Sequence, residues 1–443
     1  MYIPEYVQNL MDRLENAGFQ AWAVGGCVRD DALGITPHDY DLCTSALPEQ
    51  TKELFSDHGM FLAGLKHGTV SVITEVDVVE ITTFRTEGDY SDNRHPGWVK
   101  FVPTIEEDLS RRDFTINAMA YSPVRGYADP FGGLEDLKRK QLKAVGDPVQ
   151  RFQEDSLRIL RGARFAARFG MEIEEQTLRA MFSQGFLMDG LARERVFSEL
   201  TKFFTLASAE LIVQMEPLLT QVIPELGKCV GFDQKNPHHV YDVFTHMAVV
   251  TGKLPQEPTL RFAGILHDIG KPDTMSIDEQ GRGHFYDHAR VSAELAGDIL
   301  HRLKAPTAFR EDVVWLVSHH MSLYSTETKS VRKALSRHGI ERLRRLTVLQ
   351  KADMGGKGRG GKNDRRNQID EFLRKAEAMA EREGETTLKA LAVKGGDLLA
   401  IGYPQNAELG KALNRLLEAV IGEEAKNEKV ALLALAKQWL EEG

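Results

Sequence analysis

Cysteine is scarce in this sequence, and no apolar run approaches the length that crosses a membrane. The 443 residues include three cysteines, Cys27, Cys43 and Cys229, and none of them forms a C-x-x-C pair. This excludes a disulfide framework and fits a reducing compartment. The first residues also lack a basic stretch followed by an apolar core. We therefore expect a cytoplasmic protein without a membrane partner.

An excess of positive charge is also missing, because 56 Lys and Arg stand against 65 Asp and Glu, for a net charge of -9. This balance excludes a generic nucleic-acid coat, so any contact with RNA must come from local basic faces. The hydrophobic fraction of 42% is ample for buried cores over this length. We expect several domains.

The most informative stretch reads A-V-G-G-C-V-R-D-D-A-L-G-I-T-P-H-D-Y-D-L-C-T and begins at Ala23. Gly25 and Gly26 follow an apolar lead, and glycines at such a turn let backbone N–H groups approach a phosphate. Asp39 and Asp41 are two residues apart, so a strand places both carboxylates on one side. Such a pair can hold two Mg²⁺ ions that clamp the oxygens of a phosphoryl displacement. Each pattern alone is common in turns, but together they predict nucleotidyl transfer from a nucleoside triphosphate.

The pattern G-G-x-V-R-D-x-x-L-G-x-x-x-x-D-x-D-L-x-T resembles the head signature of polymerase-β-like class II tRNA nucleotidyltransferases and bacterial poly(A) polymerases. The resemblance implies an α+β fold, with a small mixed-sheet head followed by an all-helical neck, and Arg29 among its nucleotide-binding residues. The later string D-L-S-R-R-D-F-T-I-N-A-M-A-Y is similar to the family's second motif. By register, Arg112 would contact the nucleotide and Asn117 would support the segment.

Two β-branched runs at residues 64–74 and 76–85 predict a hairpin, with Glu80 in its second strand. Glu80 is either a third acid beside the metal-binding pair or a surface residue. The polar stretch 86–97 predicts a loop. In the family this region is needed to add the terminal adenosine, which argues against an enzyme that adds only cytidines.

Residues 147–170 predict one helix, from an Asp-Pro start to a glycine stop. Steps of three or four residues place one acid and four arginines on one side, with little compensating acid: Glu154, Arg158, Arg161, Arg164 and Arg168. Such a face is costly unless an anion or a base lies there.

Asp155 and Arg158 suggest how a base is chosen. Cytosine and adenine both present an amine donor beside a ring-nitrogen acceptor, which a carboxylate and a guanidinium can match. Guanine and uracil reverse this pattern, so the pair would accept CTP and ATP. The string E-D-x-x-R-x-x-R is similar to the family motif in which the protein acts as template, and this resemblance adds Arg161 and Arg164 to the nucleotide-binding residues.

A second metal site is predicted further along the chain, where L-R-F-A-G-I-L-H-D-I-G-K places His267 and Asp268 in an apolar helix. A lone histidine there would more often be a core residue, but remote histidines and a late aspartate favour metal coordination. The pattern resembles HD-superfamily phosphohydrolases. This implies a core set of His246, His267, Asp268 and Asp353, with His288, His319 and His320 as further ligands, and a divalent transition metal as the ion.

Four segments are expected: a nucleotidyltransferase head at 1–147, a helical neck with the nucleotide-template helix and RNA binding at 148–232, an HD domain at 233–354, and a helical tail at 355–443. The glycine-rich basic stretch at 355–366 suits RNA phosphates or is a plain linker.

The function predicted is Mg²⁺-dependent addition or repair of the 3′ C-C-A end of tRNA from CTP and ATP. The alternatives are an enzyme that adds only the adenosine, a bacterial poly(A) polymerase, and an HD phosphohydrolase with a nucleotide-binding head. The sequence does not predict an oligomeric state.

Overall fold

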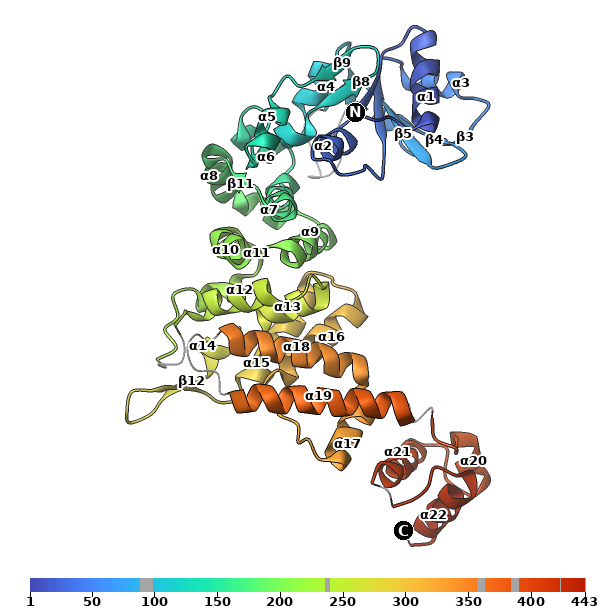
Figure 1. Cartoon of the computed structure of the whole chain (residues 1–443), viewed down its shortest axis with the longest axis vertical. Coiled ribbons are helices and arrows are strands. Elements are labelled where there is room, and N and C mark those ends of the chain that lie inside the picture. The colour runs from blue at the N-terminus through green and yellow to red at the C-terminus, as the bar shows by residue number, and fades with distance from the viewer. Residues whose placement is uncertain (88–98, 236–239, 357–362, 384–389, 423, 443) are drawn as a thin grey trace. The chain divides into compact units, whose positions relative to one another are not determined.

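The computed structural model in Figure 1 describes residues 1–87, 99–235, 240–356, 363–383, 390–422 and 424–442. Most of the predicted loop at 86–97 and the middle of the basic stretch at 355–366 lie outside these residues. The chain divides into two compact units, Met1–Pro224 and Glu225–Gly443, and each is described by itself. Among the described residues, no helix is both long and apolar enough to cross a bilayer.

The first unit is built on a seven-stranded sheet. Its strands follow the order β3 (Gly59–Phe61), β4 (Thr69–Ile73), β5 (Val78–Thr83), β2 (Asp41–Thr44), β1 (Ala21–Val24), β8 (Ala120–Ser122) and β9 (Gly126–Ala128). Only β2 and β5 run parallel, and the other neighbours are antiparallel. The sheet is therefore mixed, as predicted, and β4 and β5 form the predicted hairpin.

Helices cover this sheet because one of its interior strands, β1, is apolar on both faces. All four residues of β1 are buried, which is typical of a strand packed on two sides. The amphipathic helix α1 (Glu5–Asn16) packs against β1. The head also contains α2 (Gly26–Ala32), α3 (Pro48–Leu54), η1 (Leu65–His67), β6 (Arg85–Glu87), β7 (Val99–Phe101), α4 (Ile105–Ser110), η2 (Thr115–Asn117), α5 (Gly133–Lys138) and β10 (Gln141–Leu142).

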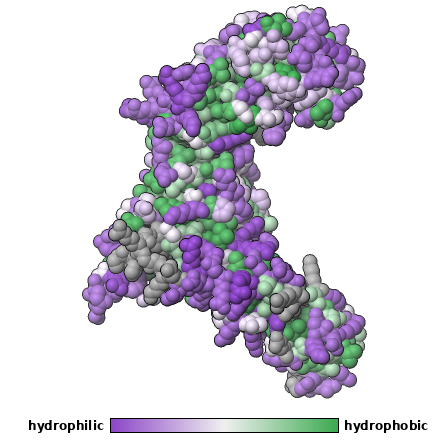
Figure 2. All heavy atoms as spheres, viewed as in Figure 1, coloured by the Kyte–Doolittle hydropathy of each residue, from purple (hydrophilic) through white to green (hydrophobic). Residues whose placement is uncertain are grey.

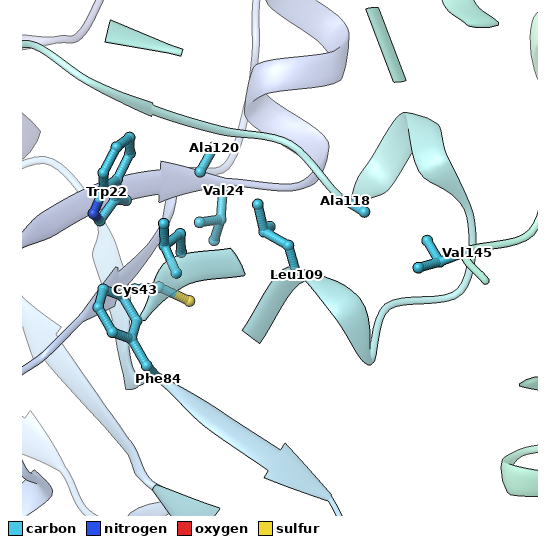
Figure 3. Close-up of a cluster of buried hydrophobic side chains, with 9 residues drawn as sticks. Trp22, Val24, Cys43, Phe84, Leu109, Ala118, Ala120 and Val145 are labelled. Carbon is cyan, nitrogen blue, oxygen red and sulfur yellow. The ribbon is translucent and has the colours of Figure 1, made fainter. Parts of the chain in front are cut away.

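One cluster of buried side chains links the sheet to α4. Figure 3 shows Trp22 and Val24 of β1, Cys43 of β2 and Leu109 of α4 turned toward one another. Cys43 lies two residues after Asp41 on β2, so both side chains project from the same face of the strand. The packing of Cys43 therefore fixes the strand whose first residue is Asp41.

The helices after the head differ from the prediction in one respect. The single helix expected at 147–170 is two helices, α6 (Pro148–Glu154) and α7 (Leu157–Phe169). The chain is extended at Asp155, with φ -142° and ψ 101°. The Asp155 side chain accepts a hydrogen bond from the backbone N–H of Leu157 at 3.0 Å, so this residue starts a new helix instead of continuing the old one.

The rest of the first unit is almost entirely helical. It comprises β11 (Glu172–Ile173), α8 (Glu175–Ser183), η3 (Gly185–Gly190), α9 (Arg193–Leu206), α10 (Ala209–Gln214) and α11 (Glu216–Val222). In the view of Figure 2, hydrophobic residues gather over this helical region, whereas the surface over the strands is mostly hydrophilic.

Over its described residues, the second unit is helical apart from one hairpin. Its elements are η4 (Pro224–Cys229), α12 (Val243–Lys253), α13 (Pro258–Leu266), α14 (Lys271–Thr274), β12 (Met275–Ile277), β13 (Gly283–Phe285), α15 (His288–Arg302), α16 (Thr307–His319), α17 (Thr328–His338), α18 (Ile340–Gly356), α19 (Asn363–Glu383), α20 (Gly395–Ala400), α21 (Ala407–Ile421) and α22 (Lys429–Glu442). The last three helices share a core of their own, which includes Leu398, Leu416 and Leu432. The predicted α+β class, with a mixed-sheet head followed by helical regions, is confirmed.

Candidate active site

A polar cavity of about 740 Å³ lies within the first unit, between the head and α7. Of the eleven residues predicted to bind nucleotide or metal in this unit, Glu80 is not in the lining. The other ten line the cavity: Gly25, Gly26, Arg29, Asp39, Asp41, Arg112, Asp155, Arg158, Arg161 and Arg164. The lining also includes Arg111, Asp113, Asn117, Leu157, Phe165, Arg168 and Arg195. Sequence reasoning missed Asp113 and Phe165, although Asp113 directly follows the two arginines of the second motif.

Gly25 is required at the turn between β1 and α2 for two reasons. Its φ is +69°, a conformation that side-chain-bearing residues rarely adopt. A Cβ atom there would also lie 2.8 Å from Nη1 of Arg112, closer than packing allows. The turn and the arginine therefore fit together only because residue 25 has no side chain.

Carboxylates gather at the start of β2. Asp41 pairs in parallel register with Glu80 of β5, and Asp39 lies two residues before it. The cavity walls partly desolvate Asp41 and raise the pKa of its carboxyl group, and the nearby Glu80 and Asp39 raise it further against an opposing effect of Arg112. Burial and neighbouring carboxylates therefore both disfavour the charged form of Asp41, and Arg112 favours it.

The arginines of the second motif are held by one fully buried acid, Asp108. Its Oδ1 accepts hydrogen bonds from Arg111 at 2.9 and 3.1 Å, and its Oδ2 accepts one from Arg112 at 3.2 Å. Burial raises the pKa of Asp108, but the two guanidinium groups outweigh it and hold the pKa below its usual range. Asp108 thereby orients both arginines at the cavity.

The arginine face of α7 is not short of compensating acid, and that expectation is wrong. Each arginine is paired with a carboxylate of another segment: Arg158 with Glu154 at 2.8 Å, Arg161 with Asp113 at 2.6 Å, Arg164 with Glu199 at 3.0 Å and Arg168 with Asp30 at 3.8 Å. These acids come from four different elements or loops. Sequence spacing alone therefore could not show the pairing.

The predicted base-selecting pair lies at the break between α6 and α7. Two N–H groups of Arg158 donate to Glu154 and to the carbonyl of Arg151, and a third donates to the carbonyl of Arg111. A guanidinium has five donors, so two remain beyond its contacts within the described part of the chain. The Oδ2 atom of Asp155 lies 3.8 Å from Arg195 of α9.

The second unit brings six predicted metal ligands together in two groups. One group is His246, His267, Asp268 and Asp353, and the other is Asp268, His288 and His320. Within each group the candidate ligand atoms lie within 4.8 Å of one another, and every residue is buried. Asp268 belongs to both groups. Its Oδ2 lies 2.7 Å from Nζ of the buried Lys271.

His319 is not brought to these groups. Its Nδ1 atom lies 2.9 Å from the carbonyl of Trp315, and its ring stacks on that indole with centroids 4.5 Å apart. The neighbouring His320 is the one that turns inward, because consecutive residues of a helix project about a quarter-turn apart.

Comparison with known proteins agrees with this layout. The sequence matches the Poly A polymerase head domain over residues 21–143, the Probable RNA and SrmB- binding site of polymerase A over 170–228, and the HD domain over 238–354. The CCA-adding enzyme of Streptococcus mutans is 32% identical over 443 residues, which covers 98% of this chain and 96% of that enzyme. The chain belongs to the CCA-adding enzyme family.

Other members of the CCA-adding enzyme family match a shorter part. The CCA-adding enzymes of Limosilactobacillus fermentum and Streptococcus uberis are 48% and 49% identical, over 45% and 44% of this chain. These alignments span about half the length of the relatives, 49% and 48%.

Solved structures of the CCA-adding enzyme family are similar along the whole chain. A Bacillus stearothermophilus CCA-adding enzyme in complex with CTP has a TM-score of 0.74 at 25% identity, covering 100% of this chain and 98% of that one. A Thermotoga maritima CCA-adding enzyme complexed with tRNA has a TM-score of 0.54 at 19% identity, covering 99% of this chain and 96% of that one, and it shows likeness of fold.

Replacing Gly25 by Ala tests the fit at the turn. The added methyl group meets Arg112 and the positive φ is strained, so we expect nucleotide incorporation to fall about tenfold or more, as for a misplaced binding group. Gly34→Ala is the matched control, because its φ of +71° is similarly strained but a Cβ there has open space. Equal losses in the two variants would show that strain alone, and not the contact with Arg112, explains the effect.

The Asp113–Arg161 pair predicts a dependence of stability on pH. Although burial raises the pKa of Asp113, Arg161 and Asn117 lower it from the ordinary 3.8 to about 2. The pair's stabilisation is therefore present above pH 3.8 and is lost as the pH falls toward 2. The free energy of unfolding of Asp113→Asn, measured with urea, should differ most from the parent protein near neutral pH. A difference that stays constant into acid would contradict this assignment.

Proposed function

We propose that this chain adds or repairs the 3′-terminal C-C-A sequence of tRNA, using CTP and ATP without a nucleic-acid template. The observation that supports this most is the single cavity in which the Asp39 and Asp41 carboxylates face the arginines of the second motif and of α7. Carboxylates can bind the metal ions that accompany the reacting phosphate of a nucleoside triphosphate. Arginines can bind the phosphates of the nucleotide and donate hydrogen bonds to its base.

Asp39 and Asp41 are the residues that would hold Mg²⁺. Both carboxylates line the same cavity, and burial, followed by the nearby Glu80 and Asp39, raises the pKa of Asp41. A bound cation would favour the charged form of such a group, which supports this fit. Magnesium bound there would neutralise charge on the triphosphate and activate the acceptor hydroxyl. Glu80 stays either a third acid of this set or a surface residue; it pairs with Asp41 in the sheet but is exposed and lies outside the cavity lining.

Arginines would bind the phosphates and select the base. Arg112 is partly buried and, although burial lowers its pKa, Asp108 and Cys43 raise it above its ordinary value, so it stays charged. The turn at Gly25 and Gly26 leads into the same cavity. At the base of the nucleotide, Asp155 would accept a hydrogen bond from the amine of cytosine or adenine, and Arg158 would donate one to the ring nitrogen.

The acceptor would be a structured RNA bound by the helices that follow the head. Arg195 of α9 lines the cavity, and Arg193 begins the same helix. Segment 170–228 matches a family described as a probable RNA-binding site, and a relative of similar fold is described as complexed with tRNA. The tail is a further candidate for contact with RNA.

Incorporation assays on defined tRNA transcripts test this function. Transcripts ending before C-C-A, and after C-C, are incubated with CTP, ATP or both, and we expect completion of C-C-A on each. Adenosine added only to the C-C transcript indicates the A-adding alternative, and long A tails on any RNA indicate a poly(A) polymerase. No incorporation would leave the HD phosphohydrolase alternative.

Asp41→Asn should lower incorporation about a thousandfold or more, because charge stabilisation by a bound metal ion supplies several kcal/mol. Asp57→Asn is a control in the same unit, since Asp57 pairs with the distant Arg13 outside the cavity lining. Substantial activity in Asp41→Asn would refute the metal assignment. The same assay on Glu80→Gln decides between its two roles. A large loss of incorporation indicates a third metal-binding acid, and unchanged incorporation indicates a surface residue.

We further propose that the two groups sharing Asp268 bind divalent transition metal ions. Imidazole and carboxylate ligands suit such ions, and burial of all six residues with mutually close ligand atoms supports the fit. Metal ions held there would supply a nucleophile for hydrolysis of a phosphate ester.

Adjacent histidines make a matched test of this second site. His320→Gln should lower the metal content of the purified full chain, and any metal-dependent hydrolysis of a 2′,3′-cyclic phosphate, whereas His319→Gln should leave both unchanged. Metal content measured by mass spectrometry gives the readout. Equal metal content in the two variants would contradict the ligand assignment, and full metal loading without hydrolysis would indicate a structural role.

A further inference from the structure

Six side chains form a continuous polar circuit that joins the head to α7 at two positions, Arg161 and Arg168. Arg161 donates to Oδ2 of Asp113 at 2.6 and 2.8 Å, and Asn117 donates to Oδ1 of the same carboxylate at 3.0 Å. Arg29 donates to Oδ1 of Asn117 at 2.6 Å. Asp30 pairs with two arginines: its Oδ1 lies 2.7 Å from Nη2 of Arg29 and its Oδ2 lies 3.8 Å from Nη2 of Arg168. Because Arg168 belongs to α7, the circuit contacts that helix a second time.

Asn117 is the one neutral member of this circuit, and its amide fits in only one direction. Its N–H group faces a carboxylate and its carbonyl faces a guanidinium, so both ends make hydrogen bonds to charged groups. The side chain is buried, with 7% of its surface exposed, which makes any mismatch costly. Neither a carboxylate nor an aliphatic side chain can fill both roles.

The circuit connects the two halves of the nucleotide site. Arg29 lies on α2, directly after the turn at Gly25 and Gly26. Arg161 lies one turn after Arg158 on α7. Aromatic rings reinforce the same junction, since Arg29 lies 4.7 Å from the ring of Phe169.

We propose that Asn117 is a positioning residue for nucleotide selection: it sets the register between the phosphate-binding turn and α7, and thereby the place of Arg158 at the base. This inference rests on the proposed function. Misplacing Arg158 relative to the phosphates weakens the hydrogen bonds that distinguish cytosine from uracil, whereas merely lowering the fraction of folded enzyme affects both nucleotides equally. The preference for CTP over UTP therefore separates positioning from simple structural support.

The first test is Asn117→Asp, which is nearly isosteric but places a second carboxylate against Asp113. We expect kcat/KM for CTP to fall about tenfold or more, the size of a lost hydrogen bond to a charged group, and the ratio of kcat/KM for CTP to that for UTP to fall as well. The substrate is a tRNA transcript that ends before C-C-A. Asn16→Asp is the control, because it makes the same change at an exposed position in the same unit.

The second test exchanges the two groups. In the double variant Asp113→Asn with Asn117→Asp, Arg161 can donate to the new amide oxygen, the new amide can donate to residue 117, and Arg29 can donate to the new carboxylate. We expect this variant to recover part of the CTP preference lost in Asn117→Asp. The backbone N–H of Phe114 loses its carboxylate acceptor in the exchange, so recovery is partial.

Three results would decide against the inference. An unchanged ratio in a folded Asn117→Asp enzyme means that the circuit supports only the fold, and so does the absence of any recovery in the double variant. If Asn117→Asp does not fold, the ratio is measured in Asp30→Asn, which loosens Arg29 and Arg168, and an unchanged ratio there has the same meaning. Failure of the parent chain to incorporate either nucleotide instead refutes the proposed function.

Discussion

Pairing of guanidinium and carboxylate groups is the constraint on which the N-terminal unit depends. Arginines crowded around one cavity repel one another, and removing them from water adds a desolvation cost. Ion pairs with acids from separate segments offset both the repulsion and the desolvation. These acids include Asp113 beside η2, Glu199 on α9 and Asp30 on α2. Because each acid belongs to a different element, the charge pairs also join those elements.

This arrangement suits the proposed function, in which the site receives a highly charged nucleotide. The arginines that a triphosphate would meet already pair with carboxylates. A bound triphosphate would therefore replace some of these ion pairs or add further ones to the same guanidinium groups. The carboxylates of Asp39 and Asp41 lie in the same cavity, where they would repel the phosphates unless a cation intervened. The balance of these two groups is consistent with joint binding of nucleotide and metal.

Local patterns predicted much of the site, and contacts between distant segments limited the rest. Gly25, Asp39 and Asp41 lie within one short stretch, and the antiparallel pairing of β1 with β2, which sets Val24 opposite Asp41, brings them together. The hairpin that carries Glu80 also follows from strand patterns, whereas the mixed sheet is predicted from the family resemblance. In contrast, the pairing of Arg164 with Glu199 joins residues on separate helices, which periodicity along one helix cannot reveal. The side on which His319 lies depends on the packing of Trp315 around it.

The helix break at Asp155 shows how such a local difference changes chemistry. In a continuous helix, Asp155 and Arg158 would be three residues apart on one face and would be placed to form an ion pair with each other. The chain is extended at Asp155 instead, and Arg158 pairs with Glu154 at 2.8 Å. The Asp155 carboxylate accepts from the backbone N–H of Leu157 at 3.0 Å and lies 3.8 Å from Arg195. A carboxylate and a guanidinium that read one base edge together must not satisfy each other. In the proposed function, the interruption of the helix therefore leaves both side chains able to contact the base, which an ion pair between them in an uninterrupted helix would prevent.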